Sequence, residues 1–148
     1  MTEITILIVV LFVAGGFGLF LQRRDGRARP TGEAAQDAQR AELLAAAGVG
    51  TAGPAVLHFS AEWCGPCAAV RRVVSGVTAD LADRPRPPRD IEVDIDAEPA
   101  LARELNVLSL PTTFVFDAEG RERFRISGVP KTGDLRSALA PLTAGDQA

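Results

Sequence analysis

The chain holds two cysteines, Cys64 and Cys67, and both lie in the run Trp63-Cys64-Gly65-Pro66-Cys67. Thiols at this spacing can close a small disulfide and open it again. If a helix begins at this motif, unpaired backbone N–H groups and the positive end of the helix dipole favour the thiolate form of the first cysteine. The motif therefore predicts a redox-active disulfide in which Cys64 is the activated thiol.

Two other uses of a cysteine pair are less favoured. A structural zinc site needs about four nitrogen or sulfur ligands, whereas this sequence offers two cysteines and one histidine, His58. A static disulfide that closes so short a loop constrains the unfolded chain little. Thiol–disulfide exchange proceeds between sulfur atoms, so we expect no metal and no cofactor.

The composition indicates one folded domain with an additional segment, since 148 residues are 47% hydrophobic and 24% charged. Four arginines follow the first apolar segment directly: Arg23, Arg24, Arg27 and Arg29. Without these and the two acids before residue 30, 12 basic and 17 acidic residues remain. The folded part is therefore mildly acidic, and no basic stripe indicates a nucleic-acid partner.

The first apolar segment, Ile4 to Leu21, has eighteen residues and no charge. As a helix it would be roughly 27 Å long, which nearly spans a bilayer core. A cleavable signal peptide would begin with basic residues and end in small ones, but this segment lies between Met1-Thr2-Glu3 and Gln22-Arg23-Arg24. We therefore expect a retained anchor, with a signal peptide and a buried soluble helix as the alternatives.

The arginines predict the orientation of this anchor, because positive flanks stay on the cytoplasmic side. The domain would then face the cytoplasm, where a reducing environment returns the pair to thiols. The sequence predicts three parts: a transmembrane anchor at 1–22, a juxtamembrane linker at 23–32 and a folded domain at 33–148. An extracytoplasmic domain is the alternative.

The domain alternates between strand and helix patterns. Ala55–Phe59 is an apolar run typical of a buried strand, and apolar residues after Cys67 recur at helical spacing. Prolines make Asp83 to Asp90 an exposed loop. The other expected elements are helices at Glu33–Ala47, Pro99–Leu105 and Thr132–Leu142, and strands at Ile91–Ile95, Thr112–Phe116 and Glu122–Ser127. This order predicts an α/β fold with a mixed sheet between helices.

Three motifs between Pro54 and Leu142 resemble the thioredoxin family. The first is the cysteine motif, preceded by Ala61-Glu62, and the second is Leu108-Ser109-Leu110-Pro111-Thr112, whose proline is cis and faces the cysteines in that fold. The third is Gly128, where the family also carries a glycine beside the active site. The resemblance implies a thioredoxin fold, preceded here by one N-terminal transmembrane helix.

The resemblance also implies roles for the residues of the cysteine motif. Cys64 would attack the substrate disulfide, and the more buried Cys67 would resolve the mixed disulfide. Gly65 and Pro66 would set the conformation of the loop between the cysteines and help to set the reduction potential of the cysteine pair. Trp63 would cover the site as an apolar platform, and its alternative is a core side chain.

The remaining site residues would form a substrate-binding groove. A cis Pro111 would leave neighbouring backbone groups free to pair with an extended substrate segment, and its alternative is an ordinary loop proline. Leu110 and Gly128 would border the same groove.

The sequence departs from the family at two places. His58 stands where many thioredoxins carry a buried acid. Glu92 stands where the family carries the lysine that accompanies this acid. An imidazole could accept the proton of the second thiol; alternatively, His58 is a core residue paired with the backbone or with Glu92. Only Asp25 to Pro30 is available for the first strand of the family, so we expect it to be short or missing.

The sequence thus predicts a membrane-tethered thiol–disulfide oxidoreductase that reduces protein disulfides. It would be reduced in turn by an electron-donor reductase or a membrane redox partner. The alternatives are an extracytoplasmic reductase or oxidase, and a non-catalytic docking module that uses the groove between Trp63 and Pro111.

Overall fold

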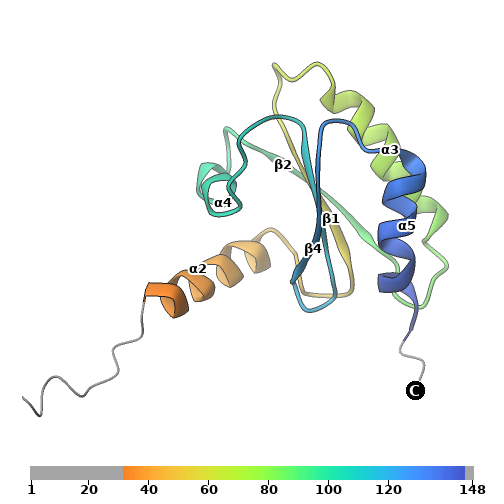
Figure 1. Ribbon diagram of the computed structural model, residues 1–148, viewed down its shortest axis with the longest axis horizontal. Coiled ribbons are helices and arrows are strands. Elements are labelled where there is room, and N and C mark those ends of the chain that lie inside the picture. The colour runs from red at the N-terminus through yellow and green to blue at the C-terminus, as the bar shows by residue number, and fades with distance from the viewer. Residues whose placement is uncertain (1–31, 146–148) are drawn as a thin grey trace, which may run out of the picture. The chain divides into compact units, whose positions relative to one another are not determined.

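The computed structural model describes residues 32–145 of the chain (Figure 1). The anchor expected at Ile4–Leu21 and the strand expected between Asp25 and Pro30 lie outside the described residues. Among the helices within 32–145, none has the length and apolar character that crossing a bilayer requires.

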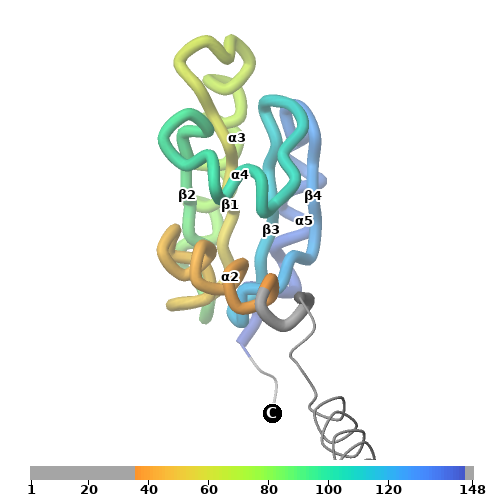
Figure 2. Tube along the Cα trace, turned by 90° about the vertical axis from the view of Figure 1, so that its left-hand side faces the viewer, coloured from red at the N-terminus to blue at the C-terminus, as the bar shows by residue number. Residues whose placement is uncertain are grey.

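A single four-stranded sheet organises the described residues. Its strands lie in the order β2-β1-β3-β4, with bounds β1 Ala55–Ser60, β2 Arg89–Asp94, β3 Thr112–Phe116 and β4 Glu122–Ser127. β1 pairs with β2 in parallel and with β3 antiparallel, and β3 and β4 form an antiparallel hairpin. The predicted mixed sheet is therefore confirmed, and Figure 2 shows its strands side by side between the helices.

Helices cover both faces of the sheet. α2 (Gly32–Ala46) and α4 (Pro99–Glu104) contribute Leu44 and Leu101 to one core, which includes Phe59 and Phe114 of the sheet. α3 (Cys67–Asp80) and α5 (Thr132–Thr143) contribute the second core, whose members include Val74, Leu139 and Val56. The helical spacing of apolar residues after Cys67 is explained by this second core.

β1 is the central strand, and every one of its residues is buried. Successive side chains of a strand point to opposite faces, so Leu57 and Phe59 enter the first core while Val56 enters the second. A strand that is covered on both faces is apolar throughout. His58, on the same face as Val56, and Ser60 at the end of the strand are the residues that depart from this pattern.

The expected exposed loop ends earlier than the prolines indicate. β2 begins at Arg89, whose N–H donates to the carbonyl oxygen of Pro54 at 2.9 Å. Its guanidinium also donates to the carbonyl of Gly48. Arg89 and Asp90 therefore belong to a strand and not to the loop. Pairing with β1 begins two residues before Ile91, where the alternation of apolar and polar residues begins in the sequence.

The turn between β3 and β4 is held by one buried carboxylate. Asp117 accepts hydrogen bonds from the backbone N–H groups of Glu119 and Arg121 at 3.1 and 2.9 Å, and from the Arg121 guanidinium at 3.0 Å. Burial opposes ionisation, but bonds from Arg121 and Arg123 outweigh it and hold the pKa of Asp117 below its ordinary value. This turn fixes the register that brings Ser127 opposite Thr112.

We expect Asp117→Asn to destabilise the domain at neutral pH and to make its stability less sensitive to acid. Because the folded pKa is lowered, the carboxylate stabilises the fold above its unfolded pKa of about 4, and this contribution is lost as the pH falls further. Urea unfolding at pH 7 and at pH 3 measures both effects. An equal loss of stability at the two pH values would contradict the assignment.

Candidate redox site

Cys64 and Cys67 form a disulfide at the carboxyl end of β1, with their Cα atoms 5.5 Å apart. The chain turns after Ala61, whose carbonyl accepts a hydrogen bond from the N–H of Cys64. α3 then begins at Cys67, and its first turn carries no acidic side chain. The motif therefore lies at the positive end of a helix dipole, as the sequence indicates.

The two sulfur atoms differ in accessibility. Cys64 is partly exposed, whereas Cys67 is 2% exposed and its Sγ lies 3.9 Å from the carbonyl oxygen of Phe59. A sulfur in a second protein can therefore reach Cys64 more readily than Cys67. This difference is what attack by the first cysteine and resolution by the second require.

Trp63 lies on the surface, so its interpretation as a core residue is wrong. Its side chain is 70% exposed, and the indole N–H donates to Asp96 at 3.1 Å. Asp96 follows β2, and this hydrogen bond holds the indole of the loop after β1 against the segment after β2. The sequence does not indicate this partner, because the two residues meet only through the parallel pairing of β1 and β2.

The Leu110–Pro111 peptide is cis, and it lies at the same end of the sheet as the cysteines. Phe59 pairs with Thr112, so the chain after β1 and the chain before β3 leave the sheet together. Gly128 joins them because its N–H donates to the carbonyl oxygen of Pro111 at 2.9 Å. The structure thus brings the three motifs of the sequence to one edge.

Gly128 is required by its backbone conformation. Its φ of +84° lies in the left-handed region, which side chains with a Cβ rarely adopt. An added Cβ would meet no atom within 4 Å, so crowding is not the reason for this glycine. Leu110, in contrast, is half-buried and packs against the core beneath α2 and α4.

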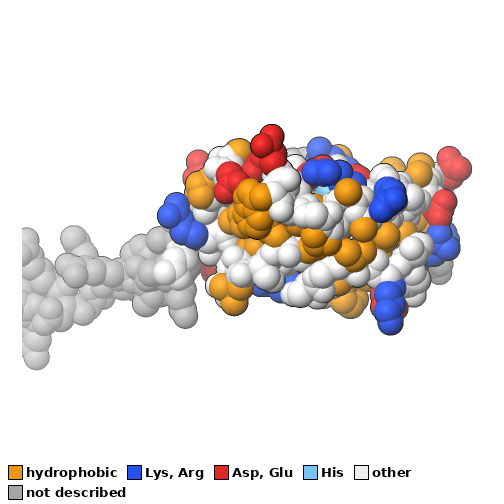
Figure 3. Space-filling model, turned by 90° about the horizontal axis from the view of Figure 1, so that it is seen from above, with side chains coloured by type: hydrophobic (Ala, Val, Ile, Leu, Met, Phe, Trp, Pro, Cys, Tyr) orange, Lys and Arg blue, Asp and Glu red, His pale blue; other side chains and the backbone are white. Residues whose placement is uncertain are grey.

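A hydrophobic surface surrounds the cysteines at this end of the sheet. Figure 3 looks onto it and shows hydrophobic side chains gathered across the centre, with charged side chains along the margins. Trp63 and Leu108 are its most exposed large members, and Leu108 is 86% exposed. Leu108 is not among the predicted site residues, although an apolar residue three positions before Pro111 is a visible signal in the sequence.

His58 is buried on β1 and pairs with a carboxylate of β2. Its ring is 2% exposed, and Nε2 donates to Oδ1 of Asp90 at 2.9 Å. Asp90 is 33% exposed and links the imidazole to the surface. The expected partners of a structural histidine, a backbone group or Glu92, are therefore not the partners found.

Glu92 lies directly opposite His58 in the strand register but bonds elsewhere. Its carboxylate accepts from the Arg71 guanidinium at 2.7 Å. Burial raises its pKa, yet hydrogen bonds from Ser60 and Arg71 outweigh this effect and hold the pKa below the ordinary value. Glu92 is therefore an ionised partner of Arg71, which leaves Asp90 to pair with the histidine.

The His58–Asp90 pair lines a surface hollow of about 430 Å³. α3 and β2 supply its other lining residues, which are Arg71, Arg72, Ser75 and Glu92. A buried imidazole that borders an open hollow can exchange protons with solvent. The sequence predicts Asp90 to lie in the loop and therefore does not predict its contact with His58, although Asp90 continues the alternation of Glu92 and Asp94.

Comparisons with known proteins agree with this geometry. The thioredoxin family model matches residues 38–141. A thioredoxin of Mycolicibacterium smegmatis is 40% identical over 92 residues, which cover 62% of this chain and 80% of that protein. Thioredoxin H2 of Arabidopsis thaliana is 38% identical over 60% of this chain and 62% of its own. A thioredoxin-like protein of Synechocystis is 32% identical over 70% of this chain and 91% of its own.

The fold is similar to that of solved structures. A structure of thioredoxin-2 from the malaria parasite matches with a TM-score of 0.53 and 24% identity, covering 60% of this chain and 82% of that one. At this identity the match supports the fold alone.

Proposed function

This chain belongs to the thioredoxin family, and we propose that it reduces protein disulfides through Cys64 and Cys67 while an N-terminal anchor holds it at a membrane. The family and its relatives make the chain a thiol–disulfide oxidoreductase. The observation that carries the proposed roles is the disulfide between an accessible Cys64 and a buried Cys67, beside the Pro111–Gly128 contact.

The proposed reaction consists of two exchanges. The thiolate of Cys64 attacks one sulfur of the substrate disulfide, so a mixed disulfide forms and one substrate thiolate leaves. Cys67 then loses its proton and attacks the sulfur of Cys64, which forms the Cys64–Cys67 disulfide and releases the second substrate thiolate. The substrate gains two electrons and the cysteine pair loses two. An electron-donor reductase or a membrane redox partner returns the pair to thiols.

Substrate binding would use the surface around the cysteines. Trp63 offers an exposed apolar platform, and Gly65 and Pro66 form the exposed turn between the sulfurs. Pro111 and Gly128 present backbone at the same edge, where an extended substrate segment could pair. Leu110 would support this edge from below, since it packs against the core.

We further propose that His58 takes up the proton of Cys67 and that Asp90 positions the imidazole. His58 precedes Phe59, whose carbonyl lies beside the sulfur of Cys67. The Asp90 carboxylate fixes the ring through Nε2 and would stabilise the positive charge that the ring gains. The bordering hollow would then pass the proton to solvent.

The membrane location rests on the sequence alone. Ile4–Leu21 supplies an uncharged apolar segment, and the arginines that follow it favour a cytoplasmic domain. An outward-facing reductase or oxidase is the competing function, because the same cysteine chemistry can run in either direction.

The roles of the two cysteines can be separated with insulin as substrate. We expect Cys64→Ser to abolish disulfide reduction by the full chain, because no attacking thiolate remains. Cys67→Ser should accumulate a mixed disulfide that gel electrophoresis without reductant detects. Ser137→Ala, on the exposed part of α5, is the matched control and should retain activity. A Cys64→Ser, Cys67→Ser double variant that still reduces insulin would refute the proposal.

The proton route predicts a selective effect on the second exchange. We expect His58→Gln and Asp90→Asn to lengthen the life of the mixed disulfide by about tenfold or more, since general acid–base catalysis contributes on the order of 10² or more. The mixed disulfide should form at a rate within about twofold of that of the unmodified chain, because the attack by Cys64 does not use this proton transfer. Stopped-flow traces recorded between about pH 5 and pH 9, a range that includes the pH at which imidazole groups commonly change charge, measure both steps.

Two controls accompany these variants. Glu119→Gln removes an acid at the β3–β4 turn, away from the His58–Asp90 contact and its hollow, and should leave the second exchange unchanged. If Asp90→Asn changed stability but neither the lifetime nor its pH profile, Asp90 would be structural only.

The orientation is tested by fusing a reporter that is active only in the cytoplasm to the C-terminus. We expect activity in the unmodified fusion, because the arginines hold the flank of the anchor inside. A fusion in which all four arginines are replaced by glutamine should lose part of this reporter activity. If the unmodified fusion shows no reporter activity, and a reporter that is active only in the periplasm works at the same position, the outward-facing alternative is favoured.

A further inference from the structure

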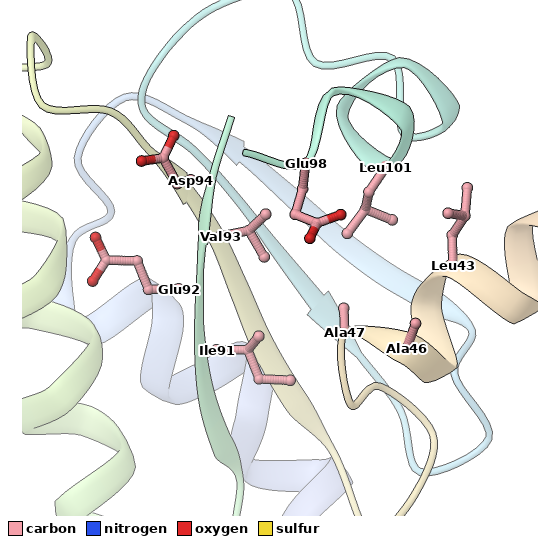
Figure 4. Close-up of a pocket in the computed structure, with 9 residues that line it drawn as sticks. All are labelled: Leu43, Ala46, Ala47, Ile91, Glu92, Val93, Asp94, Glu98 and Leu101. Atoms are coloured by element: carbon pink, nitrogen blue, oxygen red, sulfur yellow. The ribbon is translucent and has the colours of Figure 1, made fainter. Parts of the chain in front are cut away.

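A row of polar side chains crosses the face of the sheet that α3 and α5 cover. In the strand register, Glu92 of β2 lies opposite His58 of β1, and His58 lies opposite Thr113 of β3. Residues that pair across neighbouring strands place their side chains on the same face. Figure 4 shows the Glu92 side chain pointing from β2 toward α3, whereas Ile91 and Val93 point the other way. His58 therefore has Glu92 on one side and Thr113 on the other.

The hydroxyl of Thr113 is buried without a hydrogen-bond partner. The residue has no exposed surface, and its Oγ1 atom bonds to no group among residues 32–145. Its neighbours on this face belong to the second core, which includes Val115, Val74 and Leu135. An unpaired buried hydroxyl destabilises a fold, and valine would have the same shape without this cost. A role in function would explain why threonine stands here.

His58 needs a second hydrogen-bond acceptor once it has taken up a proton. In the neutral ring, Nε2 donates to Asp90, so Nδ1 is the nitrogen that can receive a proton. The imidazolium carries an N–H on both nitrogens. Asp90 accepts from one of them, and the other N–H is costly to bury unless it also finds an acceptor.

Thr113 is placed to accept this second hydrogen bond. Side chains directly opposite each other in an antiparallel pair have Cβ atoms roughly 4.5–5.5 Å apart, which brings a hydroxyl within reach of an imidazole. The charged groups around the ring are otherwise engaged or are donors. Glu92 accepts from Arg71, Asp90 holds Nε2, and Arg72 lines the same hollow as a cation.

Other hydroxyls near the ring already have partners. Ser60, at the end of β1, bonds to the carboxylate of Glu92. Ser75 of α3 donates to the carbonyl oxygen of Arg72 at 3.3 Å. Thr113, in contrast, would gain its first hydrogen bond by accepting from His58, so pairing would remove the cost of its burial as well.

We infer that the hydroxyl of Thr113 accepts a hydrogen bond from Nδ1–H of protonated His58 and is a positioning residue of the proton route. In the second exchange the S–H bond of Cys67 breaks and an N–H bond forms at Nδ1 of His58. This N–H donates to Oγ1 of Thr113, while Nε2–H still donates to Asp90. When His58 releases the proton to solvent, the contact with Thr113 is lost.

The inference rests on the proposed proton route for its role in the reaction. The hydrogen bond itself requires only that His58 be protonated, which acid can bring about without any thiol–disulfide exchange. The contact and the reaction can therefore be tested separately.

The contact is tested by NMR of the full chain in its disulfide form with isotope-labelled histidine, because the sequence holds one histidine. We expect Thr113→Val to move the midpoint of the histidine titration to lower pH by about one pH unit, the size of one hydrogen bond to a charged group. Thr113→Ser keeps a hydroxyl and should stay within about 0.3 pH unit of the unmodified chain, which is a factor of about two.

Thr143→Val is the matched control. It also removes a buried threonine hydroxyl, but this one donates to the carbonyl oxygen of Ala140 near the end of α5. The histidine titration should not change in this variant. An unchanged titration in Thr113→Val, or an equal shift in Thr143→Val, would overturn the inference.

Unfolding in urea gives a second test of the contact. Above the titration midpoint of His58, Thr113→Val should raise the urea concentration at which half of the chain is unfolded, because an unpartnered hydroxyl is removed. A lower urea midpoint would show that the hydroxyl already has a partner beside the neutral ring, which would overturn the inference.

The role in the reaction is tested by the lifetime of the mixed disulfide. Thr113→Val should lengthen it by about threefold, because the rate of proton transfer follows the basicity of the acceptor only in part, and Thr113→Ser should restore it. If His58→Gln lengthens this lifetime while Thr113→Val changes neither lifetime nor titration, the inference is wrong and the proton route stands. If the titration shifts but neither variant changes the lifetime, the positioning role and the proton route are both wrong.

Discussion

The burial of β1 on both faces is the constraint on which the rest of the structure depends. Because Ala55–Ser60 is covered by two cores and flanked by β2 and β3, it is a rigid base for the loop that follows it. That loop carries Cys64, and α3 begins at Cys67. Any polar side chain on such a strand needs a partner, which explains why Asp90 accompanies His58.

The placement of acid and base on this sheet differs from the family pattern that the sequence resembles. The central strand carries the imidazole, and the carboxylate lies on the neighbouring strand, where it reaches a surface hollow. The charged carboxylate therefore lies near the surface and not in the core, where the free-energy cost of removing it from water would be larger. The same strand, β2, also carries Glu92, whose carboxylate bonds to Arg71 of α3, so one alternating segment supplies both acids that pair on this face of the sheet.

Local patterns in the sequence predicted most of the elements, because each element follows from spacing within its own segment. The buried run of β1, the helical spacing after Cys67 and the turn at Gly120 are examples. The contacts that complete the site depend on strand register, which no local pattern contains. Asp90 meets His58 and Asp96 meets Trp63 only once β2 lies parallel to β1. The exposure of Trp63 likewise depends on where the loop leaves the sheet.

The parallel pairing of β1 and β2 also has a consequence for how the chain reaches its native state. β1 pairs with β2 across the whole of α3, and with β3 across α4 as well. Closing these long loops costs chain entropy before the contacts can compensate for it. During synthesis, β1 and its cysteines therefore emerge well before their neighbours exist. Until β3 is made, the dithiol belongs to an exposed hydrophobic segment, and a chaperone that covers this segment would also shield the thiols from premature oxidation.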